Sequence, residues 1–354
     1  PTTALIILHL LIATLIVFAA PLLLRQTIPP PLTMIATWVA LYSAKQTAWG
    51  LMSEWLAMSY LLLSCMLYLS WLSRPTVLRA FGVSLLISLA LLTRSALLPW
   101  AALLMFMPLQ APRGIGRTTA VALCAGLLPI LLWCSVTLQR AGSFSLAPYE
   151  GLNLLATARS LGPLPLKGTD SERTRSVITY LNERGVTASD TALVAADVHR
   201  WEGEFYGVFH SNFNRAVEAL QHSEGHDPLR PLEIAANSLR AHPDRYRLFA
   251  RGGVRTLIME YMPLIIACAA LSFWLVRRDS RYTRWSIGVA TICVVALGYL
   301  TTIFGTMLWL HRYIIPAQSV LLFCTVISTA RLINTCTGSS ASKGRLTTGN
   351  SGNR

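Results

Sequence analysis

Five charged residues interrupt stretches of the sequence that are otherwise apolar: Lys45, Glu54, Arg94, Arg140 and Arg312. A charge at the centre of a bilayer costs roughly 2.5 to 3.5 kcal/mol, so membrane-embedded ionisable groups are kept mainly where they meet a partner or a pathway. Guanidinium groups present fixed hydrogen-bond donors that match phosphate oxygens. These residue types therefore indicate a site for a phosphate-bearing ligand at the membrane surface.

Arg94 is the most informative of these residues because it breaks the apolar run from Leu85 to Leu104 where the chain must turn. Two interpretations are open. The charged end of the arginine reaches the interface, or it is directed at a phosphate held at the outer membrane surface. Arg312, with His311 before it and Tyr313 after it, admits the same two interpretations.

The other charged residues have plainer explanations. Lys45 and Arg140 are better explained as solvated cations at the interface. Glu54 begins an apolar segment, where a carboxylate is favoured by the helix dipole. A capping role for Glu54 is as good an explanation as binding a sugar hydroxyl or pairing with Arg94.

A metal site is a weak prediction. His222 and His226 have the i, i+4 spacing of a helical metal site, but Gly225 and the pair Asp227-Pro228 make a turn the better prediction. No glycine-rich loop of the kind that holds nucleotide phosphates occurs either. We therefore expect neither a metal nor a cofactor.

The composition determines which elements must carry these residues. Apolar residues make up 53% of the 354 residues and charged residues 13%, and the mean hydropathy is +0.50, whereas soluble domains carry roughly 25% charged residues. This excludes an ordinary soluble enzyme. We expect an all-α polytopic membrane protein of nine crossings, of which 32–44 and the hairpin 79–109 are marginal. The apolar segments are 4–24, 32–44, 51–72, 79–93, 95–109, 118–138, 256–276, 285–310 and 313–333.

The net charge of +14 lies outside the one long polar segment, residues 142–255, which has thirteen basic and thirteen acidic residues. If the loop at Arg25 is cytoplasmic, nine crossings place thirteen of the remaining seventeen basic residues inside, as the positive-inside bias requires. The polar segment then lies outside. It has no basic stripe with interleaved aromatic residues, so nucleic acid is not an expected partner.

Four parts follow: transmembrane helices over 1–141, an extracytoplasmic and mainly helical loop domain over 142–255, transmembrane helices over 256–333, and a disordered cytoplasmic tail over 334–354. Residues 245–255 form a basic amphipathic stretch that is expected along the membrane surface. In the loop domain, the candidates for contact with a sugar are Asn153, Trp201, Tyr206 and Phe209, although core packing explains the aromatic residues better.

Several motifs occur in a fixed order along the chain. They are Met52-Ser53-Glu54, Leu92-Thr93-Arg94-Ser95, Gln139-Arg140 followed by Gly151-Leu152-Asn153-Leu154, His242-Pro243 with Tyr246, and His311-Arg312-Tyr313 with Pro316. In this order they resemble the motifs of GT-C class glycosyltransferases that use polyprenyl-phosphate sugars, the group of protein O-mannosyltransferases and lipid A aminoarabinose transferases. Ser95 stands where that family has a proline, and Ala141 stands where it has an asparagine.

The resemblance implies a GT-C-like helical bundle in a bacterial inner membrane, with the loop domain periplasmic. It implies inverting transfer of a sugar from a polyprenyl-phosphate donor to a lipid, glycan or protein acceptor outside the membrane. On this hypothesis Arg94 and Arg312, with Lys45 and Arg140, hold the donor phosphate. The catalytic residue stays unknown, because the family's acidic residue on the first outer loop has no counterpart here. We expect a chain that is truncated at its N-terminus and lacks that loop.

Two other functions stay open. A flippase or transporter of lipid-linked sugar also needs a lipid-phosphate site, although such proteins often show internal repeats, and we find no convincing repeat here. An O-antigen ligase or polymerase also combines one large outer loop with a lipid-linked sugar, but it consumes pyrophosphate-linked donors.

Overall fold

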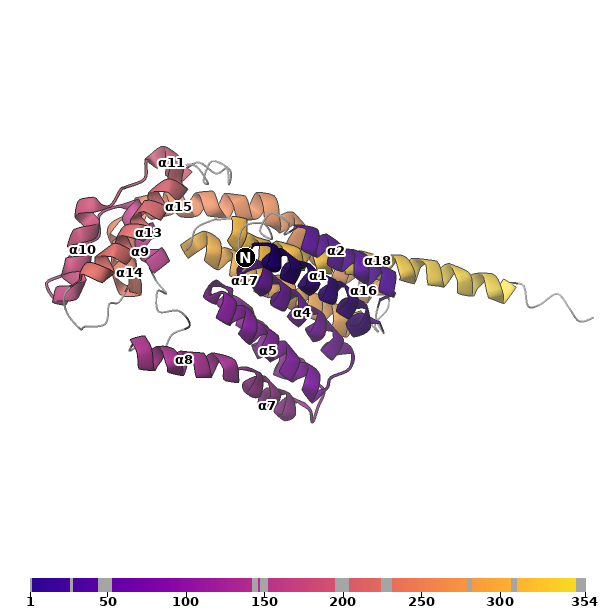
Figure 1. Cartoon of the computed structure of the whole chain (residues 1–354). Coiled ribbons are helices and arrows are strands. Elements are labelled where there is room, and N and C mark those ends of the chain that lie inside the picture. The colour runs from indigo at the N-terminus through magenta and orange to yellow at the C-terminus, as the bar shows by residue number, and fades with distance from the viewer. Residues whose placement is uncertain are drawn as a thin grey trace, which may run out of the picture. The chain divides into compact units, whose positions relative to one another are not determined.

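The computed structural model describes residues 2–25, 28–43, 53–141, 146, 152–194, 204–223, 231–278, 282–306 and 311–347. Among these residues all regular structure is helical, and no strand occurs (Figure 1). The chain divides into two compact units, each of which is described by itself. Unit 1 comprises Pro1–Leu128, Pro263–Leu297 and Ile315–Arg354, and unit 2 comprises Pro129–Met262 and Gly298–Ile314.

Unit 1 contains most of the apolar helices. Its N-terminal helices are α1 (Thr2–Leu24), α2 (Pro30–Ser43), α4 (Ser53–Ser73), α5 (Val77–Thr93), the 3-10 helix η1 (Ser95–Ala101), α6 (Ala102–Gln110) and α7 (Gly116–Gly126). The greater parts of α16 (Met262–Arg278), α17 (Thr283–Thr306) and α18 (His311–Thr347) complete it. Thr76 caps α5, because its hydroxyl accepts the backbone N–H of Arg79 at 3.3 Å.

Small residues and hydroxyl groups join the helices of unit 1. Ser84 Oγ donates to the Leu123 carbonyl at 2.6 Å, and Ser88 Oγ donates to the Gly126 carbonyl at 2.8 Å. A Cβ added at Gly126 would lie 2.5 Å from the Cβ of Ser84, so glycine is required for this close approach of α5 and α7. Membrane helices associate through such packing and interhelical hydrogen bonds, because lipid tails are as apolar as the helix surfaces.

Among the described residues, four helices are long and apolar enough to cross a membrane: Trp55–Ser73, Gly116–Gln139, Thr283–Ile303 and Ile315–Ile333. A fifth is added if Pro243–Met259 and Met262–Arg277 form one broken span. The nine crossings expected from the sequence are therefore not found in the described part of the chain. For three of the expected crossings the reason is length. α2 has 14 residues, α5 has 17, and the apolar run after Arg94 is divided between η1 and α6, whereas a crossing needs about 20 residues.

Unit 2 holds the long polar segment, which is folded as helices. The helices that lie wholly or mostly in unit 2 are α8 (Leu128–Ala141), α9 (Leu152–Leu161), α10 (Glu172–Arg184), α11 (Asp190–Val194), α13 (Glu204–His222), α14 (Pro231–Ala241), α15 (Pro243–Thr256) and the π-helical turn η2 (Leu257–Tyr261). Leu155 of α9, Val177 and Leu181 of α10, Ala216 of α13 and Ala235 of α14 are fully buried and belong to one hydrophobic core. The loop domain expected over 142–255 thus lies in a larger unit that also takes in most of α8 and residues 298–314.

The C-terminal tail differs from its prediction. α18 continues to Thr347, so residues 334–347 are helical, whereas the Ser-, Thr- and Gly-rich composition predicts disorder. The physical reason is that extending a helix already formed by the apolar span adds one hydrogen bond for each residue that is ordered, without a new nucleation step.

Candidate functional site

Arg94 occupies the junction between α5 and η1. Its backbone is extended, with φ of −152° and ψ of 103°, and this ends α5 after Thr93. The N–H of Arg94 still donates to the Ala90 carbonyl at 2.8 Å, and its own carbonyl accepts the N–H of Leu97 at 3.1 Å as η1 begins. The break in the apolar run thus lies at the residue where the sequence predicts it. A cation at this end of α5 is favoured by the partial negative charge of the last helical carbonyls.

The other residues of the predicted phosphate site lie at helix ends. Glu54 is the second residue of α4, Arg140 is in the last turn of α8, and His311, Arg312 and Tyr313 begin α18. Their side chains lie outside the described part of the structure, as does the whole of Lys45.

The predicted site residues are divided between the two units. Arg94 and Glu54 belong to unit 1, whereas Arg140, Asn153 and the three residues that begin α18 belong to unit 2. Arg94 and Arg312 lie in different units, so their joint contact with one donor phosphate stays a prediction.

The residues proposed to contact a sugar differ in burial. Phe209 is 4% exposed, and its ring stacks on Phe213 with 6.1 Å between the ring centroids, which fits the core-packing alternative. Tyr206 is half-buried, with its ring 5.6 Å from that of His210. Asn153 is also half-buried, and its carbonyl accepts the Thr157 hydroxyl at 2.9 Å. Trp201 lies outside the described residues.

Arg159 is a buried cation that the sequence analysis did not single out. It is 5% exposed, and its Nε donates to the Leu181 carbonyl at 2.9 Å. Its Nη2 donates to the Gly185 carbonyl at 2.6 Å, and its Nη1 donates to the Thr187 hydroxyl at 2.8 Å. Burial, with a contribution from the like charge of Arg215, lowers the pKa of Arg159. These bonds satisfy carbonyls at the C-terminal end of α10, so Arg159 has a structural role.

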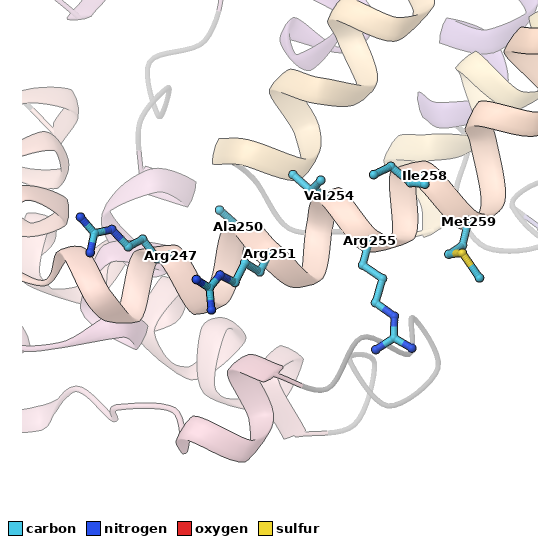
Figure 2. Close-up of a pocket in the computed structure, with 7 residues that line it drawn as sticks. All are labelled: Arg247, Ala250, Arg251, Val254, Arg255, Ile258 and Met259. Atoms are coloured by element: carbon cyan, nitrogen blue, oxygen red, sulfur yellow. The ribbon is translucent and has the colours of Figure 1, made fainter.

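An open groove of about 490 Å³ runs along α15 and η2. The seven residues that line it are Arg247, Ala250, Arg251, Val254, Arg255, Ile258 and Met259, and we call this surface the α15 face (Figure 2). The residues recur every three or four positions, which places them on one side of a helix. Five of these residues lie in the basic amphipathic stretch 245–255 that the sequence singled out, and Ile258 and Met259 extend it into η2.

The α15 face combines guanidinium donors with apolar side chains. This combination suits an amphiphile that presents an anionic group beside hydrocarbon. In the described ranges, no three histidine, cysteine, aspartate or glutamate residues are placed to hold a metal ion.

The chain matches no protein-family model, no curated protein and no solved structure.

Proposed function

We propose that this protein is a membrane glycosyltransferase that moves a sugar from a polyprenyl-phosphate donor to a lipid, glycan or protein acceptor outside the membrane. The observation that carries the proposal is Arg94 at the end of α5. α5 has 17 residues and rises about 25 Å, which is too short to cross the roughly 30 Å hydrocarbon core, but the long arginine side chain at its end can reach the membrane surface. A guanidinium at its end therefore comes near the depth of a lipid phosphate.

The proposed reaction needs a group that stabilises the leaving phosphate. The acceptor hydroxyl attacks the anomeric carbon, the bond from that carbon to the phosphate oxygen breaks with inversion, and the acceptor proton passes to a general base. Polyprenyl phosphate leaves with the additional negative charge. Arg94 and Arg312, with Lys45 and Arg140, are proposed to stabilise this charge, and each charge-assisted contact contributes roughly 1.5 to 3 kcal/mol.

The test is transfer from a radiolabelled polyprenyl-phosphate sugar by the full-length protein in reconstituted membranes. Arg94→Ala and Arg312→Ala should each lower kcat/KM by about 10- to 100-fold, which corresponds to the loss of one such contact. Arg94→Lys should retain part of the activity because it keeps the charge but not the paired donors. Arg117→Ala, at an exposed arginine of α7, is the control and should leave transfer unchanged. Unchanged transfer in both alanine variants would contradict the assignment.

A flippase or transporter of lipid-linked sugar is the alternative from another class, and it predicts a different product. Transfer releases free polyprenyl phosphate, whereas a flippase moves the donor intact to the other leaflet. An O-antigen ligase or polymerase is separated by its donor, since it requires a pyrophosphate-linked oligosaccharide. Measuring the released lipid with each donor distinguishes the three functions.

A further inference from the structure

The α15 face is the exposed side of a helix whose opposite side is packed into unit 2. On the packed side, Phe249 is fully buried, with its ring centroid 5.7 Å from that of Phe205 and 6.4 Å from that of Tyr246. On the exposed side, Val254, Ile258 and Met259 are 51%, 53% and 69% exposed. Because α15 is anchored by its packed side, the exposed apolar side chains are held in a fixed direction.

Two of the three arginines on this face make no ion pair with any residue that the structure describes. Asp244 pairs with Arg247 at 3.1 Å, and both side chains are largely exposed. Arg251 and Arg255, one and two turns further on, lie beside the apolar residues of the face (Figure 2). Val254 and Ile258 point to one edge of the helix, while Arg255 and Met259 point to the other. The face is therefore positively charged along an apolar strip.

The chain continues from this face directly into an apolar helix. η2 and α16 contribute 5 and 17 residues, which together reach the roughly 20 residues of a membrane crossing. α15 itself carries four arginines and Asp244 within 14 residues, and placing those charges in hydrocarbon would be too costly for a span. α15 is thus suited to lie at the membrane surface immediately before a crossing.

We propose that the α15 face binds the surface of a bilayer that contains anionic phospholipid. Arg251 and Arg255 contact the headgroup phosphates, and Val254, Ile258 and Met259 insert among the first methylene groups. The groove is an open surface along successive turns of one helix, whereas a pocket for a single lipid would be enclosed, so the occupant is a leaflet. This inference does not rest on the proposed sugar transfer.

The test places an environment-sensitive fluorophore on the face of the full-length protein. The label is attached through Ala250→Cys, in a background where Cys124 and Cys336 are serine. The protein is reconstituted in phosphatidylcholine with and without phosphatidylglycerol, and quenching by brominated acyl chains reports contact with the membrane. We expect phosphatidylglycerol to increase quenching, and high salt to reverse the increase.

The double substitution Arg251→Gln/Arg255→Gln should lower the ratio of quenched to unquenched label by at least tenfold in phosphatidylglycerol, because each basic residue near an anionic surface contributes about 1 kcal/mol, or about fivefold. Arg175→Gln/Arg184→Gln removes the same charge from exposed positions on α10 and is the matched control. Val254→Ser/Ile258→Ser should reduce quenching while the response to salt is kept, which tests the apolar strip separately.

Three results would overturn the proposal. The first is equal quenching in the two lipid compositions, and the second is an equal loss in the α10 control. The third is a response to another source of phosphate. Inorganic phosphate could produce the same fluorescence change, or polyprenyl phosphate in phosphatidylcholine could saturate the change at one molecule per protein. Either form of the third result would assign the face to a single phosphate group.

Discussion

Large apolar side chains differ in exposure between α1 of unit 1 and the helices α9, α10, α13 and α14 of unit 2. In unit 1 the exposed residues of α1 include Ile7, Leu11, Leu15, Phe18 and Leu22, all more than half exposed. Polar groups bond between its helices instead, as where Gln110 donates to the Thr291 hydroxyl at 2.8 Å. In unit 2 the apolar residues of α9, α10, α13 and α14 form the interior. The exposed side of α1 is suited to hydrocarbon surroundings, whereas the packed helices α9, α10, α13 and α14 are suited to water.

This difference means that the same substitution has different effects in the two units. In unit 2, burial from water supplies most of the stability. In unit 1, apolar side chains that face lipid stay in an apolar medium whether or not the helices are packed together, so packing and hydrogen bonds between helices carry the stability.

The largest expected difference between the units comes from replacing one leucine by alanine in each. Leu155→Ala, in the core of unit 2, should lower the free energy of unfolding by roughly 2 to 5 kcal/mol because it leaves a cavity. Leu15 of α1 is 68% exposed, and Leu15→Ala should change the free energy of unfolding by less than about 0.5 kcal/mol. Hydrogen exchange of the reconstituted protein measures both, as lost amide protection in α9 and α10 or in α1. Equal losses would break the comparison.

A smaller effect is expected from filling the close contact in unit 1. Gly126→Val introduces a Cβ that would meet Ser84 at 2.5 Å, so α5 and α7 must separate. We expect a loss of roughly 1 to 3 kcal/mol, typical of overpacking, measured as a lower Tm in detergent. Gly298→Ala is the control, because an added Cβ there has nothing within 4 Å, and its Tm should be unchanged or slightly higher. A tolerated Gly126→Val would mean that this contact does not hold the helices.

The smallest effect should come from a single interhelical hydrogen bond. Ser88→Ala removes the bond from Ser88 Oγ to the Gly126 carbonyl and should cost about 0.6 kcal/mol, the average for such bonds in membranes. Ser135→Ala is the matched control, since the bond that Ser135 makes among the described residues is within its own helix, to the Leu131 carbonyl at 2.8 Å. Detergent unfolding of the two variants side by side gives the difference. A larger loss for Ser135→Ala would contradict the role assigned to interhelical bonds.

Local pattern predicted most of the helices and the break at Arg94. Within the loop domain that was expected to be mainly helical, Ser171 caps α10, because its hydroxyl accepts the Thr174 N–H at 3.3 Å. The lengths of the apolar helices were predicted less well. Apolar composition shows that a segment avoids water, but it does not show whether that segment runs as one straight helix, so the number of crossings was overestimated.

The groups that an arginine contacts were the least predictable from the sequence. Arg331, one of the thirteen basic residues that the sequence assigns to the cytoplasmic side, is 5% exposed, and its guanidinium lies 3.6 Å from the centroid of the Trp285 ring. Arg159 showed no sequence signal, because the carbonyls that it binds come from a turn more than twenty residues away. Residue type indicates what an arginine can bind, but its partner is chosen by segments distant in the chain.

The sequence by itself determined that this is a helical protein with apolar, membrane-suited segments, a long neutral polar segment and an arginine at the end of α5. These properties follow from composition and from spacing along a few turns, which act locally. Only the tertiary structure decided that Phe209 packs inside, that Arg159 closes a turn, and that Arg251 and Arg255 stay on an exposed side of α15. Burial depends on which helices cover a face, and that is set by contacts between residues far apart in sequence.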